Sequence, residues 1–423
     1  MNSRETAHPT TTLLRSLLKA NQLPGGSADL GELRRLDRGP QDVDRRLVVE
    51  AGVGAEEPGA AAACLVLARR RHPVGCASRR LIYLVGMDPR GRFGSLADRV
   101  LDWTVLPGYS RVGYALRERI VPRGPLELDG KTVMLTGAGS GIGEAACGQL
   151  ARAGARVLMV VRDLEKGERS RRRVAAAAPG AEPELVRCDV SDLASVRDAA
   201  AAFLDSGRSL DVLVNNAGVL PAARRHTAEG FELTFATNVL GPFLLTALLL
   251  PALEAAAPAR VVNVSSGGMY TARIDLDDLQ LERREFDGAR FYAHTKRIEV
   301  ALSEEWSRRL DGRGVVVHSA HPGWVATPGV AASLPRFHKL MRPLLRDADA
   351  GADTIVWLAG SPPAAENAGA FWHDRRPRPK HRVPWTRESA AERAILFDRC
   401  AELCGIEPAA IGEPGNRSRP RRV

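Results

Sequence analysis

A tyrosine and a lysine four residues apart are the first residues of this sequence whose types could do chemistry. Tyr292 is the first and Lys296 the last residue of the segment Tyr-Ala-His-Thr-Lys. On a helix this spacing puts both side chains on one face. A free phenol has a pKa of about 10 and is a weak base at neutral pH, but a neighbouring ammonium stabilises the phenolate. The pair could therefore exchange a proton with a reacting oxygen. Taken alone, the spacing is common by chance and more often structural, so its place in the fold decides its meaning.

Two serines and an asparagine add polar groups that could act on a substrate. The β-branched run at residues 259–265 predicts a strand, and Ser265 and Ser266 stand at its carboxyl end. Ligands of open parallel sheets bind at that edge, so one of these hydroxyls could bind a substrate oxygen. Asn238 lies inside a helical pattern although an amide is a poor helix former. It is therefore a further candidate for a specific role.

A glycine-rich turn lies between a predicted strand and a predicted helix. Residues 136–143 read Thr-Gly-Ala-Gly-Ser-Gly-Ile-Gly. Glycines let the backbone turn sharply and approach a pyrophosphate, while a helix N-terminus offers unpaired N–H groups and a positive dipole. Glycine-rich turns also occur on ordinary surfaces, but the strand before and the helix after favour a dinucleotide site.

The residues after the second predicted strand bear on the choice of dinucleotide. An acidic residue at this point pairs with the ribose 2′-hydroxyl of NAD and repels the 2′-phosphate of NADP. The position holds Arg162, followed by Asp163, and a guanidinium binds phosphate in a bidentate manner. We expect Arg162 to favour NADP(H). The alternative, in which Arg162 is solvated and Asp163 binds the ribose of NAD, stays open.

From Lys131 onward, short β-branched runs alternate with longer helical patterns, which is typical of repeated βαβ units. Strands are predicted at residues 131–136, 156–161, 184–188, 211–214, 259–265 and 314–320, with a last one at 369–372. Helices are predicted at residues 141–153, 164–177, 192–206, 229–255, 290–311 and 348–358. The pattern predicts an α/β fold with a Rossmann-type, doubly wound parallel sheet in three αβα layers, forming a single main domain.

Extensions flank this domain on both sides. Residues 1–88 are rich in Ala, Gly, Arg and Pro without a sustained period, and are expected to form a poorly ordered extension; one hypothesis is that the natural protein begins at Met87. Residues 89–128 form a lead-in segment with two amphipathic pieces around Pro107-Gly108. These pieces are expected to cover the core, and the alternative is that they contact a membrane surface.

The catalytic domain is placed at residues 129–375. The proline-containing run 374–380 is expected to break regular structure, and a basic extension with one helix at 388–404 occupies residues 376–423.

Composition limits the classes of partner. The formal net charge of +10 comes mostly from the two ends of the chain, so a nucleic-acid surface on the core is disfavoured. The six cysteines show no CxxC pair or zinc spacing, and neither a metal site nor a disulfide framework is expected. No apolar stretch reaches the roughly 20 residues of a membrane-spanning helix, and the first 20 residues lack the order of a secretory signal. We expect a cytoplasmic protein without a transmembrane segment.

The glycines at 137, 141 and 143 give the TGxxxGxG arrangement of the short-chain dehydrogenase/reductase family, which the sequence resembles. Asn215-Asn216-Ala217-Gly218 resembles the NNAG motif of the family, Asp189-Val190 stands where the family contacts adenine, and Pro322-Gly323 with Thr327 resembles the segment that holds the nicotinamide. The resemblance implies a tetrad of Asn238, Ser266, Tyr292 and Lys296, in which Ser266 rather than Ser265 binds the substrate oxygen. It also implies cofactor contacts from Thr136, Gly137, Ser140, Gly141, Ile142, Gly143, Arg162, Asp163, Asp189, Val190, Asn215, Ala217, Gly218, Tyr292, Lys296, Pro322, Gly323 and Thr327.

The resemblance spans residues 96–385, and its details are similar to one branch of the family, that of dehydrogenase/reductase SDR family member 12. It implies NADP- or NAD-dependent hydride transfer on a carbonyl or alcohol, and relatives of this type can pair in dimers. Apolar residues in two loops suggest a lipophilic small-molecule substrate; they are Met269, Tyr270, Trp324, Leu334, Phe337 and Met341. The alternatives are a dinucleotide-binding redox sensor without catalysis, and a basic protein that binds acidic partners through its ends.

Overall fold

The computed structural model describes residues 98–99, 101–102, 104–121 and 123–411, and the backbone of three strands that precede them. The chain divides into two compact units, Met1–Asp98 and Arg99–Val423. Each unit is described by itself.

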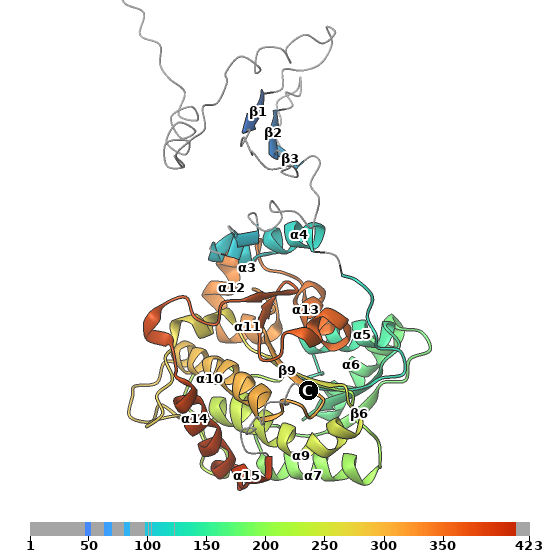
Figure 1. Ribbon diagram of the computed structural model, residues 1–423, viewed down its shortest axis with the longest axis vertical. Coiled ribbons are helices and arrows are strands. Elements are labelled where there is room, and N and C mark those ends of the chain that lie inside the picture. Colours follow the sequence, from blue (N-terminus) through green and yellow to red (C-terminus); the bar gives the residue numbers. More distant parts are fainter. Residues whose placement is uncertain are drawn as a thin grey trace, which may run out of the picture. The chain divides into compact units, whose positions relative to one another are not determined.

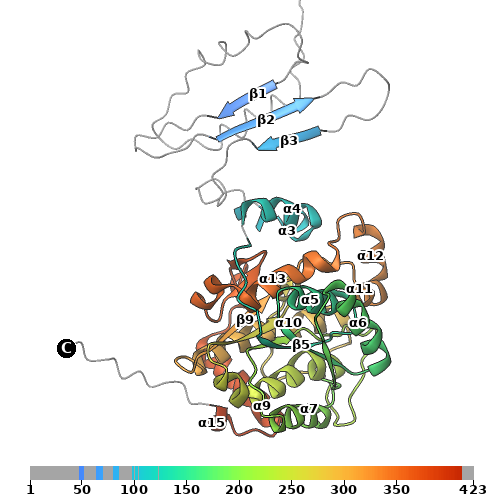
Figure 2. The same cartoon turned by 90° about the vertical axis from the view of Figure 1, so that its right-hand side faces the viewer.

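The first unit contains a three-stranded antiparallel sheet in the order β1-β2-β3 (Figure 2). The strands are β1 (Leu47–Ala51), β2 (Ala63–Arg69) and β3 (Arg80–Leu84). The sequence patterns did not predict these strands. Most of residues 1–88 lie outside the described residues, so the expected extension stays a prediction.

The second unit is built on an eight-stranded sheet in the order β11-β10-β9-β8-β7-β4-β5-β6, in which β11 alone runs antiparallel to its neighbour. Each of the six main strands predicted from the sequence is present, and so is the last short one. Their bounds are β4 (Thr132–Thr136), β5 (Arg156–Val161), β6 (Glu184–Arg187), β7 (Val212–Asn215), β8 (Ala259–Val264), β9 (Val315–Ala320), β10 (Phe371–His373) and β11 (Arg376–Arg378).

Helices cover both faces of this sheet because successive strand residues point to opposite sides. On β4, Val133 and Leu135 join one core with α5 (Gly141–Arg152), α6 (Leu164–Ala177) and α13 (Ala348–Gly360). Met134 joins the other core with α7 (Leu193–Asp205), α9 (Gly241–Ala255) and α10 (Gly288–Arg309). Figures 1 and 2 show the helices on either side of the sheet. The doubly wound α/β fold is confirmed.

The helix predicted at residues 229–255 is interrupted. It consists of α8 (Leu233–Phe235), a π-helical turn η2 (Ala236–Leu240) and α9. By length and composition, Leu233–Ala255 could cross a membrane, but 83% of its most apolar window is buried inside the protein. Its apolar character is explained by its place in the core between α7 and α10.

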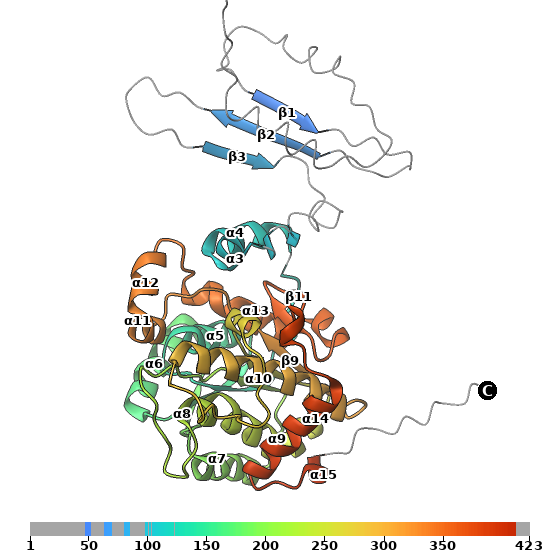
Figure 3. The same cartoon turned by 90° about the vertical axis from the view of Figure 1, so that its left-hand side faces the viewer.

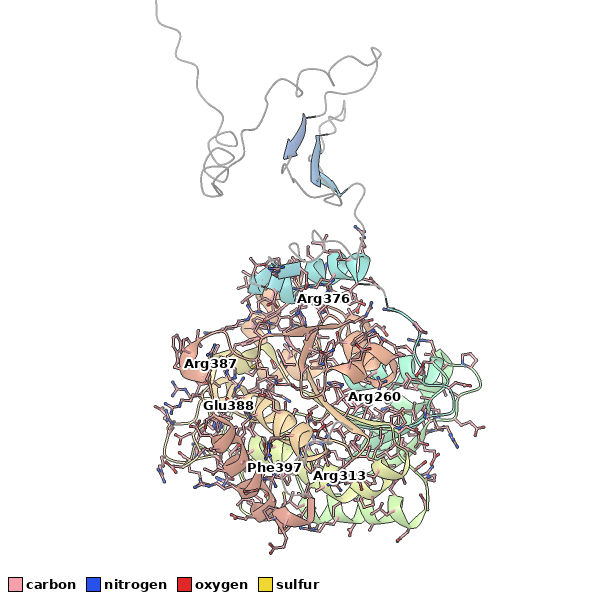
Figure 4. The ribbon with its side chains drawn as sticks, viewed as in Figure 1. Arg260, Arg313, Arg376, Arg387, Glu388 and Phe397 are labelled. Atoms are coloured by element: carbon pink, nitrogen blue, oxygen red, sulfur yellow. The ribbon has the colours of Figure 1, made fainter. Side chains whose placement is uncertain are left out.

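The run at residues 374–380 does not break regular structure as expected. Asp374 and Arg375 form the turn of a hairpin, and β11 pairs with β10 through residues 376–378. The prediction was wrong because proline is tolerated on an edge strand, where its missing N–H has no ladder partner. The helix expected after it is α14 (Ala390–Leu403), which carries Phe397 toward the core beside α10 (Figures 3 and 4), and α15 (Pro408–Ile411) follows.

The lead-in segment forms α3 (Val105–Tyr109) and α4 (Arg111–Ile120). The break between them falls at Ser110, whose hydroxyl accepts from the backbone of Val112 to cap α4, and not at Pro107-Gly108, which lies within α3. Shorter elements complete the unit: η3 (Gly267–Thr271), α11 (Pro328–Ser333), α12 (Pro335–Met341), η4 (Pro362–Glu366) and η5 (Pro384–Thr386).

Candidate active site

Tyr292 and Lys296 lie on α10, beside the carboxyl end of β8. Asp287 starts this helix, since its carboxylate accepts from the backbone N–H groups of Ala289 and Arg290. The buried Lys296 ammonium donates to the carbonyl of Val264 at 2.9 Å and lies 5.5 Å from the centre of the Tyr292 ring. The tyrosine itself is half-buried. The predicted pair therefore shares one helix face at the carboxyl edge of the sheet.

The two serines after β8 have different surroundings. The buried Ser265 hydroxyl donates to the backbone carbonyl of Lys296 at 2.7 Å, so its proton is used to hold α10. Ser266 accepts from the N–H of Gly268 at 3.3 Å and is half-buried. Because this bond leaves the proton of Ser266 available, the geometry favours Ser266 as the group that could bind a substrate oxygen.

Asn238 lies in the π-helical turn and joins two segments near α10. Its side-chain NH₂ donates to Thr295 at 3.0 Å, and its side-chain oxygen accepts from the backbone of Val219 at 2.9 Å. Such turns are rare and often occur at functional sites. Gly241 follows the turn, and any side chain there would collide with the carbonyl of Val190. The π-helical turn thus places the amide of Asn238 against Thr295, the residue before Lys296 on α10.

The glycine turn after β4 forms a cradle for a phosphate. Gly137 and Gly141 have φ values of +72° and +59°, which other residues adopt only with strain. A side chain on Gly143 would collide with the carbonyl of Gly137, so the turn can close only with glycine there. Ser140 is exposed at the N-cap of α5. The unpaired N–H groups of the twelve-residue helix α5 can therefore approach a pyrophosphate, and the fit to a dinucleotide is good.

The segment after β7 connects the glycine turn to the lysine. The Thr136 hydroxyl accepts from the backbone N–H groups of Asn216 and Ala217, at 3.0 Å each. A Cβ atom on Gly218 would lie 3.3 Å from the Lys296 ammonium. The glycine turn, the NNAG segment and Lys296 therefore lie together at the carboxyl edge of the sheet, and we call the space that they border the cleft.

Asn215, expected to contact the cofactor, is buried inside the protein. The side-chain NH₂ of Asn215 donates to Thr246 and Asn263 inside the protein, where Asn215 is buried. It therefore supports the sheet and does not face the cleft. Asn216, which was not among the predicted site residues, donates from its side chain to the carbonyl of Thr136 at 2.9 Å. Its position in the same motif was the signal that could have identified it.

The expected adenine side of the cleft is formed by the ends of β5 and β6. Arg162 is exposed, whereas the Asp163 carboxylate accepts from the backbone of Lys166 and caps α6. Asp189 accepts from the backbone and the hydroxyl of Ser191, and Val190 is buried. Asp163 is exposed as well and only its Oδ1 accepts the capping bond, so the guanidinium of Arg162 and the second carboxylate oxygen of Asp163 are both open to a ligand.

The segment after β9 returns to the glycine turn from the other side. Gly323 has a φ of +84°, and a side chain there would collide with Arg346. Thr327 caps α11, and its methyl group would lie 3.4 Å from a Cβ atom on Gly141. Thr327 is thus close to the start of α5, and the nicotinamide contacts expected of Pro322, Gly323 and Thr327 stay predictions. Ile142, also expected there, is half-buried and packs on the core beneath the turn.

Comparisons with known proteins agree with this geometry. A family model described as short chain dehydrogenase matches residues 131–336. Dehydrogenase/reductase SDR family member 12 of Bos taurus is 38% identical over 300 residues, which are 70% of this chain and 93% of that protein. The chain belongs to the short-chain dehydrogenase/reductase family. The family expected from the motifs is confirmed, and so is the resemblance to member 12.

Other members of this family are also similar. Retinol dehydrogenase 12 of Homo sapiens is 36% identical over 293 residues, covering 68% of this chain and 90% of that protein. A crystal structure of a protein from Mycobacterium paratuberculosis superposes with a TM-score of 0.55 at 31% identity, covering 68% of this chain and 98% of that one. As a short-chain dehydrogenase/reductase, the chain uses a nicotinamide dinucleotide for oxidoreduction of a small molecule.

The electrostatics of this short-chain dehydrogenase/reductase site include one residue that the sequence patterns did not reveal. The Glu299 carboxylate accepts from the Lys296 ammonium at 2.7 Å, and both side chains are buried. Burial raises the pKa of Glu299 to about 7 although the neighbouring ammonium opposes the shift. Burial is the largest single effect on the pKa of Lys296 and would lower it, but the charge of Glu299, the interaction with Tyr292 and the hydrogen bond to Glu299 together outweigh burial and hold that pKa above its usual range. The signal for Glu299 was an acidic residue three positions after Lys296.

The apolar residues expected near the substrate divide into two groups. Met269 and Tyr270 are buried in a core cluster with Tyr109, Val300 and Phe371, so the prediction that they line a pocket was wrong. Their side chains pack inward because η3 turns them toward α10. Four others are half-buried in the 324–341 segment and remain candidates: Trp324, Leu334, Phe337 and Met341.

Proposed function

We propose that this chain is an NADP-preferring oxidoreductase that acts on the carbonyl or alcohol group of a lipophilic small molecule, with Tyr292 as the proton donor and acceptor. One observation carries the proposal. The buried Lys296 ammonium lies near the Tyr292 ring and beside Gly218, at the edge of the sheet where the glycine turn opens. A phenol close to a fixed positive charge can release and recover a proton at moderate pH.

The four polar residues have separate roles in the proposal. Ser266 donates its hydroxyl proton to the substrate oxygen and fixes its position. In reduction, the Tyr292 hydroxyl gives its proton to the carbonyl oxygen; in oxidation, the phenolate takes the proton of the alcohol. Lys296 stabilises that phenolate, and Asn238 orders the segment beside it through Thr295 and Val219. A bound nicotinamide dinucleotide supplies or accepts the hydride.

The preference for NADP rests on the end of β5. Arg162 is exposed there and can bind a 2′-phosphate, whereas one oxygen of the exposed Asp163 carboxylate accepts the backbone bond that caps α6. An aspartate engaged in this way is less available for the ribose hydroxyls of NAD. The two residues together favour the phosphorylated dinucleotide.

The class of substrate rests on apolar side chains in the segment after β9, which also contains Thr327. Trp324 and Phe337 meet edge to face at 5.4 Å, and Phe337 lies on α12 with Met341. Two aromatic rings at this point would bind an apolar molecule in preference to a charged one. One relative is named for retinol, which is a lipophilic alcohol.

A spectrophotometric screen tests the proposal. The full chain is assayed for oxidation of NADPH and NADH with a panel of lipophilic aldehydes and ketones, beside Tyr292→Phe. We expect turnover that prefers NADPH and a loss of at least about 100-fold in kcat for the variant, because it lacks the transferable proton. Tyr114→Phe, on α4, is the matched control and should leave turnover unchanged.

Three results would contradict the proposal. Full activity of Tyr292→Phe would reject the assigned proton donor. A preference for NADH would reject the role of Arg162. Binding of NADPH without turnover of any compound would indicate a dinucleotide-binding sensor instead.

A further inference from the structure

His321 follows β9 and lies against residues 266–268, the serine loop after β8, yet the proposed mechanism does not use it. The residue is 2% exposed, and its Nδ1 atom accepts from the backbone N–H of Gly267 at 3.0 Å. Within the described part of the chain, its Nε2 atom has no hydrogen-bond partner. A buried imidazole with only one satisfied nitrogen is costly, so its presence beside the serine loop needs an explanation.

The bond to Gly267 requires the neutral form of the imidazole. Because Nδ1 accepts this bond, it carries a lone pair, and the single ring proton is on Nε2. An imidazolium would place a second proton between Nδ1 and the N–H of Gly267. Burial lowers the pKa of His321 well below its usual value, and the neighbouring His373 and Arg346 lower it further. The smaller effect of Asp374 opposes this shift without reversing it, so the form that the bond needs is the stable one.

The peptide unit between Ser266 and Gly267 is held at both of its polar atoms. Its N–H donates to His321. Its carbonyl, that of Ser266, accepts from the N–H of Met269 at 3.1 Å. Because a peptide unit is planar, bonds at these two atoms fix its orientation. The unit begins at the Cα atom of Ser266, so its orientation limits the directions in which the Ser266 hydroxyl can point.

The imidazole is itself held by Tyr109, the last residue of α3. The ring centres of Tyr109 and His321 are 4.5 Å apart, and the rings meet edge to face. Tyr109 is buried, and its carbonyl accepts from the N–H of Trp324 at 2.9 Å and from Arg346 at 3.0 Å. The residues matched by the family model begin only at 131. The lead-in segment therefore adds a ring to the serine loop from outside the matched residues.

Gly267 leaves no space for a side chain between its backbone and the two rings. A Cβ atom on Gly267 would lie 2.8 Å from the Tyr109 ring and 2.9 Å from Nε2 of His321. Real Cβ atoms do not approach other atoms this closely, so both rings pack directly on the backbone of the serine loop. A displacement of either ring would therefore change the support of the peptide unit after Ser266.

We infer that His321 is a positioning residue, which holds the peptide unit after Ser266 through its Nδ1 atom while Tyr109 of α3 holds the imidazole in place. The inference rests on the proposed function, in which the Ser266 hydroxyl binds the substrate oxygen. Loss of the acceptor frees the peptide unit, and the hydroxyl is then no longer fixed where that oxygen must bind. The lead-in helix α3 thus supports the active site as well as covering the core.

The first test measures hydrogen exchange of the Gly267 amide in the full chain without cofactor or substrate, by mass spectrometry at residue resolution. His321→Leu removes the acceptor, and we expect the amide to exchange roughly 10-fold faster or more. His321→Asn keeps an acceptor oxygen in place of Nδ1 and should restore the protection. Unchanged exchange at Gly267 in His321→Leu would overturn the inference.

His294 offers a matched control for this measurement. It is also buried, and its Nε2 atom accepts from the backbone N–H of Asp275 at 3.2 Å. His294→Leu should therefore speed exchange at Asp275 and leave Gly267 protected. Equal acceleration at Gly267 in His294→Leu and His321→Leu would show a general loosening of the fold and would overturn the inference.

A second pair of variants covers the case in which His321→Leu does not fold. Tyr109→Phe keeps the ring and should leave the exchange of Gly267 unchanged. Tyr109→Ala removes the ring that holds the imidazole and should make the Gly267 amide exchange faster. Equal exchange at Gly267 in the two variants would overturn the inference.

A kinetic test separates positioning from stability. With a carbonyl compound that the unaltered chain reduces, His321→Leu should lower kcat by about 10-fold or more, because the serine hydroxyl is misplaced. The Kd for NADPH should stay the same, and His321→Asn should recover most of kcat. An unchanged kcat in folded His321→Leu would overturn the inference. Failure of the proposed function would appear separately, as absent turnover in the unaltered chain, whereas the exchange of Gly267 is measured without turnover.

Discussion

Ser265 and Ser266 are neighbours at the end of β8, yet the fold gives them different tasks. Ser265 holds α10 through the carbonyl of Lys296, at 2.7 Å. Ser266 keeps a hydroxyl proton for a ligand at the carboxyl edge. The sequence alone did not decide which serine binds the substrate oxygen. The two side chains are identical in type, and they differ only in the direction in which each points from the end of the strand. The direction of each side chain decides between them.

We predict that Ser266→Ala lowers kcat/KM by about 100-fold or more, because a donor to the reacting oxygen is lost. Ser265→Ala should instead lower the free energy of unfolding by about 1 kcal/mol, the usual net value of one hydrogen bond. Steady-state kinetics and urea denaturation of both variants check this. A greater loss of kcat/KM in Ser265→Ala, with Ser266→Ala still active, would exchange the two assignments.

At the scale of elements, a buried ionic cluster attaches the lead-in helices to the edge of the sheet. The Asp374 carboxylate pairs with Arg117 of α4 and with Arg346, and all three side chains are at most 3% exposed. The two arginines also bind the backbone carbonyls of Gly108 and Tyr109 in α3. Because the Tyr109 ring lies against Gly267, next to Ser266, the cluster also supports the site.

Asp374→Asn should lower the free energy of unfolding by about 3–5 kcal/mol, because two buried guanidinium groups lose their counter-charge. Asparagine tolerates the φ of +50° at this turn position, so the backbone need not change. Asp349→Asn is the control: it lies 3.9 Å from Arg152 and is 71% exposed, and it should cost less than about 1 kcal/mol. Equal urea midpoints for the two variants would contradict the importance of the cluster.

At the scale of the whole molecule, four histidines among the described residues are buried in the neutral form. Burial lowers the pKa of His294 to about 4 and those of His318 and His373 to about 3, and it holds the pKa of His321 well below its usual value. His321 and His373 are stacked at 4.7 Å, and their neighbourhood contains Arg346. The interior of this unit therefore excludes protonated imidazole.

The free energy of unfolding should fall as the pH drops below about 6.5, where histidines of the unfolded chain begin to take up protons. The folded state binds those protons only near pH 4 to 3. The stability that comes from burying neutral histidines is therefore complete above pH 6.5, and it is lost as the pH falls from 6.5 toward 4. Each histidine contributes up to about 1.4 kcal/mol per pH unit. Urea denaturation between pH 7 and 4.5 measures the slope, and a flat profile would contradict the prediction.

The sequence by itself determined the doubly wound sheet and the positions of its motifs. Strand and helix periods depend on neighbours close in the chain, and glycines such as Gly137 are required by local backbone geometry. For the same reason the four-residue spacing of Tyr292 and Lys296 was sufficient to place both side chains on one face of a helix.

Only the tertiary structure decided which groups face the cleft. Asn215 turned into the sheet while Asn216 bound the carbonyl of Thr136, Met269 and Tyr270 entered the core, and residues 376–378 became an edge strand. The burial of Glu299 beside Lys296 likewise depends on packing against β8. These outcomes follow from contacts between segments far apart in the chain, and the local periodicity of a sequence carries no information about such contacts.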